Sequence, residues 1–380
     1  MNNIFSTNRS KNIIYGFKNN TNYPEKLVIP DGVEYISKHA FANCTFLKEV
    51  IFPKSIVDIG MYAFYNCSSL EKIIIPDDTI SSVREFTFAN CVNLKNINIP
   101  DGVLNINYKA FYRCASLKNI NISNTIEYIG KYAFEECESL KGFIIPKNIK
   151  TISKGTFYKC IKLKNIDIPD NIISIEDSAF EQCRNLEEII IPDSVKSIGI
   201  AAFCHCSKMT NIKISNTITK ISKYTFYGCE SLKEINIPEG ILEIGNNAFS
   251  NCNSLDSMYI PNGVIKIAKE AFIYCKNLKK IHIPNTITKI SNSIFYGCES
   301  LKEIDIPNSV ITIENSAFKY CRTLKKITIP NSVKSIGNWA FYGCIALKEI
   351  NIPDTTNIGK EIFAYCSALK HLPNNIKNKY

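Results

Sequence analysis

The sequence predicts an α/β-type repeat solenoid of about fifteen turns of about 23 residues, with a parallel β-sheet on one face and short helical turns on the other. Two observations favour it. Cysteine recurs at a nearly constant interval along the chain, and YGCESLKEI occurs at both 227–235 and 296–304, which are three periods apart. One such unit has too little apolar surface to fold alone, so consecutive units are expected to stack.

Sixteen cysteines mark the period. All except Cys204 follow one another at this constant interval, apart from one extra residue before Cys91 and one residue fewer before Cys366. Each of these fifteen has Phe three residues before it and, except for Met209, Leu three residues after it. The unit I-x-x-I-x-x-x-A-F-x-x-C-x-x-L-x-x-I-x-I-P therefore accounts for nearly the whole chain.

The segment after each cysteine has the alternation of a half-buried strand. In LKEINIP, Leu232, Ile235 and Ile237 are expected to face inward, whereas Asn236 faces outward. Pro238 ends the strand because proline cannot donate to a ladder. The A-F-x-x-C segment is long enough only for a helical turn or a short helix, on which Phe and Cys would share one face.

The repeat also sets the expected boundaries. Residues 1–26 do not fit it and are expected to form an N-terminal cap, residues 27–366 form the solenoid, and residues 367–380 close it as a half-repeat cap. Fifteen strands at about 4.8 Å would make a coil on the order of 70 Å long. One quasi-continuous core then replaces separate domains.

Composition favours a folded, soluble chain. Net charge is +10, but 35 acidic residues are interspersed among 45 basic ones, unlike the basic block of a nucleic-acid arm. The N-terminal stretch contains no apolar region typical of a secretory signal, and no apolar stretch approaches the length of a membrane span. From the residues alone we expect a cytoplasmic monomer without membrane insertion.

A period of roughly 20 to 29 residues with L-x-x-I-x-I is the leucine-rich-repeat signature. The unit A-F-x-x-C-x-x-L-x-x-I-x-I-P resembles the BspA-like, or Treponema pallidum type, leucine-rich-repeat family over residues 27 to about 372, with Ser123 and Ser215 in place of the usual Pro. The resemblance implies a non-catalytic binding scaffold. It also implies a surface protein that acts in adhesion or recognition, so it favours the cell surface over the cytoplasm.

The cysteine ladder first suggests disulfides or metal. Stacked cysteines would point in parallel, which disfavours bridging, and one cysteine per turn offers no C-x-x-C pair for zinc. We expect buried free thiols that act as small hydrophobes. Cys204-His205-Cys206 is the one deviation, and because further ligands at suitable spacing are missing, we expect Cys204 at a half-exposed outer position and no metal.

Enzyme motifs are missing from the sequence. G-x-S-x-G, H-E-x-x-H, Walker and dinucleotide-binding patterns do not occur. The four histidines, His39, His205, His282 and His371, fall on distant turns. We therefore expect no catalytic residue and no cofactor.

Lysine dominates one outward position of the strand. It occurs at residues 48, 95, 118, 141, 164, 233, 279, 302, 325 and 348. Such a row is consistent with an anionic polymer, glycan or nucleic acid, as partner. Glutamates at the next position, as at Glu49 and Glu303, would cancel the charge locally and favour a mixed solvated surface instead.

The outward position three residues after each of these lysines varies from turn to turn. Such variation is expected of a recognition surface, and it is also expected of drift at a solvent-exposed position. We expect the sheet face to bind another macromolecule, a protein in preference to an anionic polymer. If this face has a binding hot spot, Tyr259 beside His282 is the expected anchor, because rigid aromatic residues dominate binding energy. The same row supplies the further candidate binding residues Ile190, Lys213 and Asn236.

Overall fold

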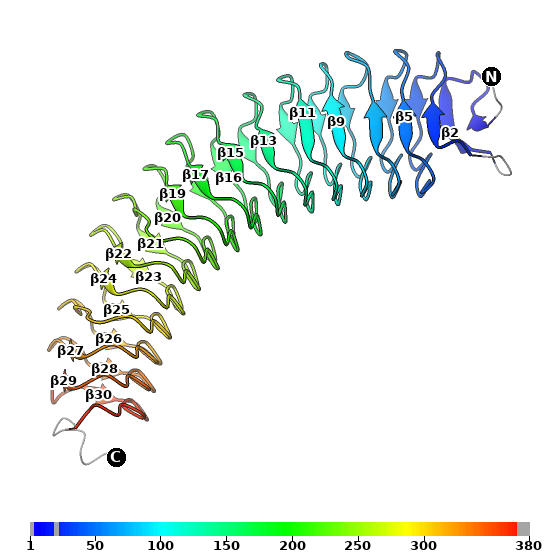
Figure 1. The fold of residues 1–380 in the computed structure, drawn as a ribbon. Coiled ribbons are helices and arrows are strands. Elements are labelled where there is room, and N and C mark those ends of the chain that lie inside the picture. The colour runs from blue at the N-terminus through cyan, green and yellow to red at the C-terminus, as the bar shows by residue number, and fades with distance from the viewer. Residues whose placement is uncertain (1–3, 19–22, 371–380) are drawn as a thin grey trace. The chain divides into compact units, whose positions relative to one another are not determined.

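A computed structural model describes residues 4–18 and 23–370 of the chain. The chain divides into two compact units, Met1–Leu186 and Glu187–Tyr380. Within each unit every turn of the coil runs through two strand positions and an outer segment (Figure 1), so parallel strands accumulate in two ladders. Part of the predicted C-terminal cap, residues 371–380, lies outside the described residues.

The first ladder contains β3 and the strands that follow the cysteines. In unit 1 these are β3 (Lys26–Val28), β5 (Glu49–Ile51), β7 (Lys72–Ile74), β9 (Asn96–Ile99), β11 (Asn119–Ile122), β13 (Gly142–Ile144) and β15 (Asn165–Asp167). In unit 2 they are β17 (Glu188–Ile190), β19 (Asn211–Lys213), β22 (Ser257–Tyr259), β24 (Lys280–His282), β27 (Lys326–Thr328) and β29 (Glu349–Asn351). Most of these pairs join residues one period apart, as Tyr259 and His282 do, so the period sets the register.

The second ladder contains two-residue strands that precede the outer segments. In unit 1 these are β4 (Tyr35–Ile36), β6 (Asp58–Ile59), β8 (Ser82–Val83), β10 (Asn105–Ile106), β12 (Tyr128–Ile129), β14 (Thr151–Ile152) and β16 (Ser174–Ile175). In unit 2 they are β18 (Ser197–Ile198), β20 (Lys220–Ile221), β21 (Glu243–Ile244), β23 (Lys266–Ile267), β25 (Lys289–Ile290), β26 (Thr312–Ile313), β28 (Ser335–Ile336) and β30 (Asn357–Ile358). The antiparallel hairpin β1 (Phe5–Thr7) and β2 (Ile13–Phe17) precedes β4.

The repeated apolar residues form the core, as the alternation predicts. Phe226, Cys229 and Leu232 are each 0% exposed. The Phe226 ring stacks on that of Phe249 in the next turn, with centroids 5.4 Å apart and planes at 18°. Successive turns therefore bury one another's aromatic faces, which a single turn could not do.

The outer segments differ from expectation, because the described residues contain no helix. In the turn of Phe226, the Tyr227 and Cys229 amides donate to carbonyls three residues back, at 3.1 and 3.2 Å. The amides of Phe226 and Gly228 instead donate to the next turn, to the carbonyls of Ala248 at 2.9 Å and Ser250 at 2.8 Å. The prediction of short helical turns was therefore wrong.

Backbone conformation explains this difference. An α-helix needs consecutive right-handed residues, whereas two left-handed residues flank each phenylalanine here, for example Tyr224 at φ 60° and Gly228 at φ 70°. Each left-handed residue turns alternate amides toward the neighbouring coil. The outer segments thus form a third set of bonds between turns, and Phe and Cys point inward without a helix.

Three serines interrupt the second ladder. In most other turns the amide after the short strand donates to the preceding turn, as from Gly245 to the Ile221 carbonyl at 2.8 Å. At Ser153, Ser222 and Ser291, which are three periods apart, the hydroxyl donates instead, at 2.6, 2.7 and 2.6 Å. At all three positions the strands on either side are not paired with each other: β12 and β14, β18 and β20, and β23 and β25. A serine hydroxyl competing for a backbone carbonyl therefore opens the ladder.

All sixteen cysteines are buried free thiols. Most ladder thiols donate to a phenylalanine carbonyl of the preceding turn, as Cys252 Sγ does to Phe226 at 3.2 Å. Burial raises the pKa of these thiols, to about 11 at Cys44 and Cys366 near the two ends and to about 12 at Cys275. They are therefore protonated at neutral pH and serve as packing groups.

Candidate functional site

The outward face of the first ladder presents every residue predicted to bind a partner. Ile190 is 65% exposed and Tyr259 is 53% exposed, and the other three side chains are also exposed. Ile190 lies opposite Lys213 across β17 and β19. Asn236 occupies the next turn but lies outside any strand. The alternation thus predicted the accessibility of these residues, whereas their binding role stays a prediction.

Tyr259 and His282 form a stacked pair on this face. They are opposite residues of β22 and β24, and their ring centroids lie 4.9 Å apart with planes at 6°. Beneath them, Met258 and Ile281 are 5% and 3% exposed. The pair is therefore a rigid aromatic surface held by a packed core, and its imidazole can form hydrogen bonds with a partner.

A shallow groove begins two turns after the turn that contains Tyr259. Its volume is about 370 Å³, and it is lined by Glu303, Asp305, Lys326 and Thr328 among others. Residues 303–305 belong to the second copy of the YGCESLKEI repeat and its continuation and form no strand, and residues 234–236 at the first copy behave alike. Both copies of the duplicated segment therefore coincide with interruptions of the first ladder.

The lysine row is only partly neutralised. Lys48 pairs with Glu25 at 2.9 Å, Lys95 pairs with Glu71 at 2.6 Å and Lys279 pairs with Asp256. Within the described residues no carboxylate pairs with three exposed members on consecutive turns, Lys302, Lys325 and Lys348. A compact cluster of unpaired ammonium groups therefore remains near the C-terminal end of the ladder.

The glutamates that were expected to cancel the charge of this lysine cluster pair with other lysines instead. Glu303 lies 3.8 Å from Lys280, and Glu349 lies 3.5 Å from Lys326. Because these two carboxylates pair with lysines of the neighbouring column, their charge is already balanced. The lysine cluster keeps a local positive excess that the sequence alone did not predict.

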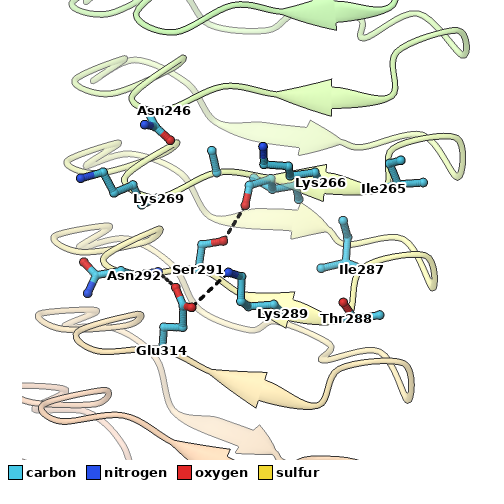
Figure 2. A pocket seen from close by; sticks show the side chains of 12 residues that line it. Asn246, Ile265, Lys266, Lys269, Ile287, Thr288, Lys289, Ser291, Asn292 and Glu314 are labelled. Carbon is cyan, nitrogen blue, oxygen red and sulfur yellow. Dashed lines mark hydrogen bonds and ion pairs between the residues drawn. The ribbon is translucent and has the colours of Figure 1, made fainter.

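A second groove opens where Ser291 separates β23 from β25. Its volume is about 530 Å³, and Figure 2 shows the Ser291 hydroxyl directed at the Ile267 carbonyl. Glu314 accepts from Lys289 at 3.1 Å and from the Asn292 amide at 2.8 Å. Sequence reasoning missed this groove, although the serines spaced by three periods were its visible signal.

Ion pairs hold two of the lysines that line this second groove, Lys266 and Lys289. Lys266 contacts Glu243 at 2.7 Å, and this hydrogen bond, with that of Lys220, holds the pKa of Glu243 below its usual range. Glu314 has two donors, as described above. General acid–base work needs a group poised near neutral pH, and the hydrogen bonds of Glu243 move its pKa away from that range.

An aromatic ladder on the outer side of unit 2 was also missed. It contains one tyrosine from each of five consecutive turns, with neighbouring centroids between 5.0 and 5.6 Å: Tyr274, Tyr296, Tyr320, Tyr342 and Tyr365. A side chain at Gly297 or Gly343 would overlap the preceding ring. Partial burial and a hydrogen bond with Tyr274 raise the pKa of Tyr296 to about 12. These rings contact one another between turns, while Tyr365 at the end of the row stays 72% exposed.

The deviation at Cys204-His205-Cys206 forms no metal-binding cluster. The His205 ring packs edge-on against Tyr227 with centroids 5.0 Å apart, and its amide donates to the Tyr227 carbonyl at 2.6 Å. Cys204 is 7% exposed, so the expectation of a half-exposed position was wrong for this residue. Among the described residues no three potential ligands come together.

Each turn contributes one strand position to each of two parallel ladders, one phenylalanine to a stack and one cysteine to a thiol ladder. This repetition places the chain in the class of leucine-rich-repeat solenoid proteins. The chain matches the BspA type Leucine rich repeat region (6 copies) over residues 14–141, 127–256 and 243–370. It therefore belongs to that family, and the resemblance inferred from its motifs is confirmed.

Solved structures agree with this assignment. A leucine-rich repeat protein from Bacteroides ovatus ATCC 8483 is 29% identical, with a TM-score of 0.73, over 96% of this chain and 91% of that one. A leucine rich cell surface protein from Faecalibacterium prausnitzii A2-165 is 28% identical, with a TM-score of 0.56, over 91% and 92%. No curated protein matched the chain. The described residues include no helix of the length and apolarity that crossing a membrane requires.

Proposed function

We propose that the protein is a non-catalytic binding scaffold that recognises a protein partner through the outward face of the first ladder in unit 2. The observation that carries this proposal is the exposed stack of Tyr259 and His282. Rigid aromatic side chains on a packed support lose little entropy on binding and act as anchors. The likeness to a cell surface protein at 28% identity supports an adhesive role.

The surroundings of the stack supply the polar rim that protein interfaces need. Lys213 and Asn236 precede it along the row, and Asp305 follows it in the groove of about 370 Å³. Charges of both signs favour a protein surface over a polymer of uniform charge. The mechanism is then complementarity spread over several consecutive turns.

Truncating the anchor is expected to weaken partner binding strongly. Tyr259→Ala should raise the Kd by about thirtyfold, the equivalent of about 2 kcal/mol. The measurement is affinity for a protein cross-linked from source cells through a photoreactive residue at position 282. Tyr365→Ala is the matched control, because Tyr365 is 72% exposed but lies on the outer side. Equal affinity of both variants would place the interface elsewhere.

The unpaired lysine cluster supports a second candidate, an anionic polymer. Lys302, Lys325 and Lys348 lie on consecutive turns about 4.8 Å apart, and the acids nearest in sequence already have partners. Phosphate or sulfate groups along a chain would then replace the small counterions of these ammonium groups.

This candidate predicts affinity that falls steeply with salt. With dextran sulfate as probe, the logarithm of the association constant should fall by about two to three per tenfold rise in salt, about one per contacted charge. Replacing Lys302, Lys325 and Lys348 by Ala should flatten this slope. The control replaces the paired Lys48 and Lys95 and should leave the slope unchanged. A flat response of the native protein would exclude the polymer.

A further inference from the structure

The two ladders of unit 1 do not begin at the same level. β2 pairs with β4, with Ile14 opposite Ile36, so the second ladder has a strand one turn before β4. β1 adds another strand beyond β2. The first ladder begins only with β3, which belongs to the same turn as β4, and no other described strand lies on its outer side. The hairpin thus closes one ladder and leaves the other open.

The repeat period identifies the segment that is missing beside β3. Phe5 stands one full period before Val28, so a regular turn would place it there. Phe5 is instead opposite Phe17 in the hairpin, and their rings stack with centroids 6.0 Å apart. The hairpin uses this segment to cover the end of the core, since Phe17 also packs on Phe41 at 4.9 Å.

The outer side of β3 carries backbone groups ready to pair. Parallel pairing uses the amide and carbonyl of alternate residues. Toward β5 these belong to Leu27 and Ile29, whose amide donates to the Ile51 carbonyl at 2.9 Å. The backbone groups of Lys26 and Val28 therefore face the open side. The β1 side differs, because a bulge between Ser6 and Thr7 disturbs its pairing pattern and protects that end.

A cavity lies beside these groups. Its volume is about 780 Å³, and its lining includes Ile4, Phe5 and Ile14 from the hairpin and Leu27 and Val28 from β3. Val28 is 55% exposed and continues an aliphatic row through Ile51 to Ile74, which is 38% exposed. The lining is mixed, because Thr7, Lys11 and Asp31 also belong to it. Strand addition would use the unpaired backbone of β3, with the aliphatic part of the lining as pockets for alternate side chains.

We propose that this cavity binds one extended segment of another polypeptide, which adds a strand to β3 and directs aliphatic side chains at alternate positions into the cavity. A folded second copy does not fit, because β2 already fills the same level of the second ladder. One strand added to β3 would bring the first ladder to the level that β2 occupies in the second. This site lies in unit 1, and it goes beyond the proposed function, whose anchor lies in unit 2.

The test uses a fluorescein-labelled peptide of residues 232–238, LKEINIP, because this segment has the alternation of the chain's own first-ladder strands. The full chain is expected to bind it saturably in a fluorescence anisotropy titration. Val28→Pro removes the amide that faces the open side while leaving the pairing with β5 intact, and should weaken binding about tenfold. Val28→Thr keeps the amide and the β-branched shape, so its affinity should stay within about twofold of native.

N-methylated peptides make the test independent of whether Val28→Pro folds. Methyl groups on the alternate amides that face β3 should abolish binding, whereas methyl groups on the other amides should leave it. The absence of saturable binding, or equal tolerance of both methylation patterns, would overturn the proposal. A dimer in sedimentation velocity that Val28→Pro dissolves would overturn it in favour of a second copy. Because Tyr259 is untouched, failure here leaves the proposed function standing.

Discussion

Raising the pH from 8 to 10.5 is expected to unfold the protein, because the buried thiols cannot ionise in place. Burial raises the pKa of fourteen ladder thiols, seven in each unit. They are Cys44, Cys67, Cys91, Cys114, Cys137, Cys160, Cys183, Cys229, Cys252, Cys275, Cys298, Cys321, Cys344 and Cys366. An unfolded thiol ionises near pH 9.

The sign follows from which state holds the protons. Above pH 9 the unfolded chain releases thiol protons that the folded chain keeps, so the free energy of unfolding falls as pH rises toward the raised pKa values of the folded thiols, the lowest of which are about 11 at Cys44 and Cys366. In this window each thiol lowers the free energy of unfolding by about 1.4 kcal/mol per pH unit. The seven thiols of one unit therefore lower its free energy of unfolding by about 10 kcal/mol by pH 10, which is comparable to the whole stability of a domain.

Far-UV circular dichroism across pH 7 to 12 under reducing conditions measures this transition, and absorbance at about 295 nm separates it from tyrosine ionisation. Cys252→Ala is the control. It lowers stability at pH 8, but it should shrink the loss between pH 8 and 10 by about 1.4 kcal/mol, because one ionising group is gone. Unchanged resistance to urea between pH 8 and 10.5 would show that the thiols are not held protonated.

Truncating one phenylalanine of the stack, Phe226→Ala, is expected to cost about 3 to 5 kcal/mol. Phe226 is 0% exposed and lies between two turns, with the Phe203 ring at 5.9 Å and the Phe249 ring at 5.4 Å. The cavity left by the ring is bounded on both sides by rigid aromatic faces, which cannot collapse into it.

Urea denaturation measures this loss in the transition of unit 2. Asn236→Ala serves as the control, because its side chain is exposed on the next first-ladder segment and its removal should change stability by less than about 0.5 kcal/mol. If Phe226→Ala lowers the free energy of unfolding by less than about 1 kcal/mol, the phenylalanine stack is not the source of the solenoid's stability.

The candidate site could be predicted in part. The repeat period makes Tyr259 and His282 neighbours on consecutive turns, and alternation predicts that both face outward, as the structure confirms. The face-to-face orientation of their rings was not predictable, because it depends on the rotamers allowed by the surrounding strands. Nor was the groove at Asp305, since YGCESLKEI reads like any other strand approach.

By itself, the sequence determined which side chains are buried and how the turns stack. Phe, Cys and Leu recur at a fixed period, and their burial follows because each turn must cover the apolar surface of the next. Outward exposure of the variable row follows from the same alternation. These properties depend on side-chain polarity, which the sequence displays directly.

Only the tertiary structure decided where the backbone hydrogen bonds go. The Phe226 amide bonds to the next turn instead of within a helix, the Ser291 hydroxyl displaces an amide and opens a ladder, and Val28 is left facing an unpaired side. In each case the alternative partners are local and distant groups of the same chemical kind. Which partner is used depends on which group lies nearby in the folded chain, and the periodicity of the side chains does not predict that proximity.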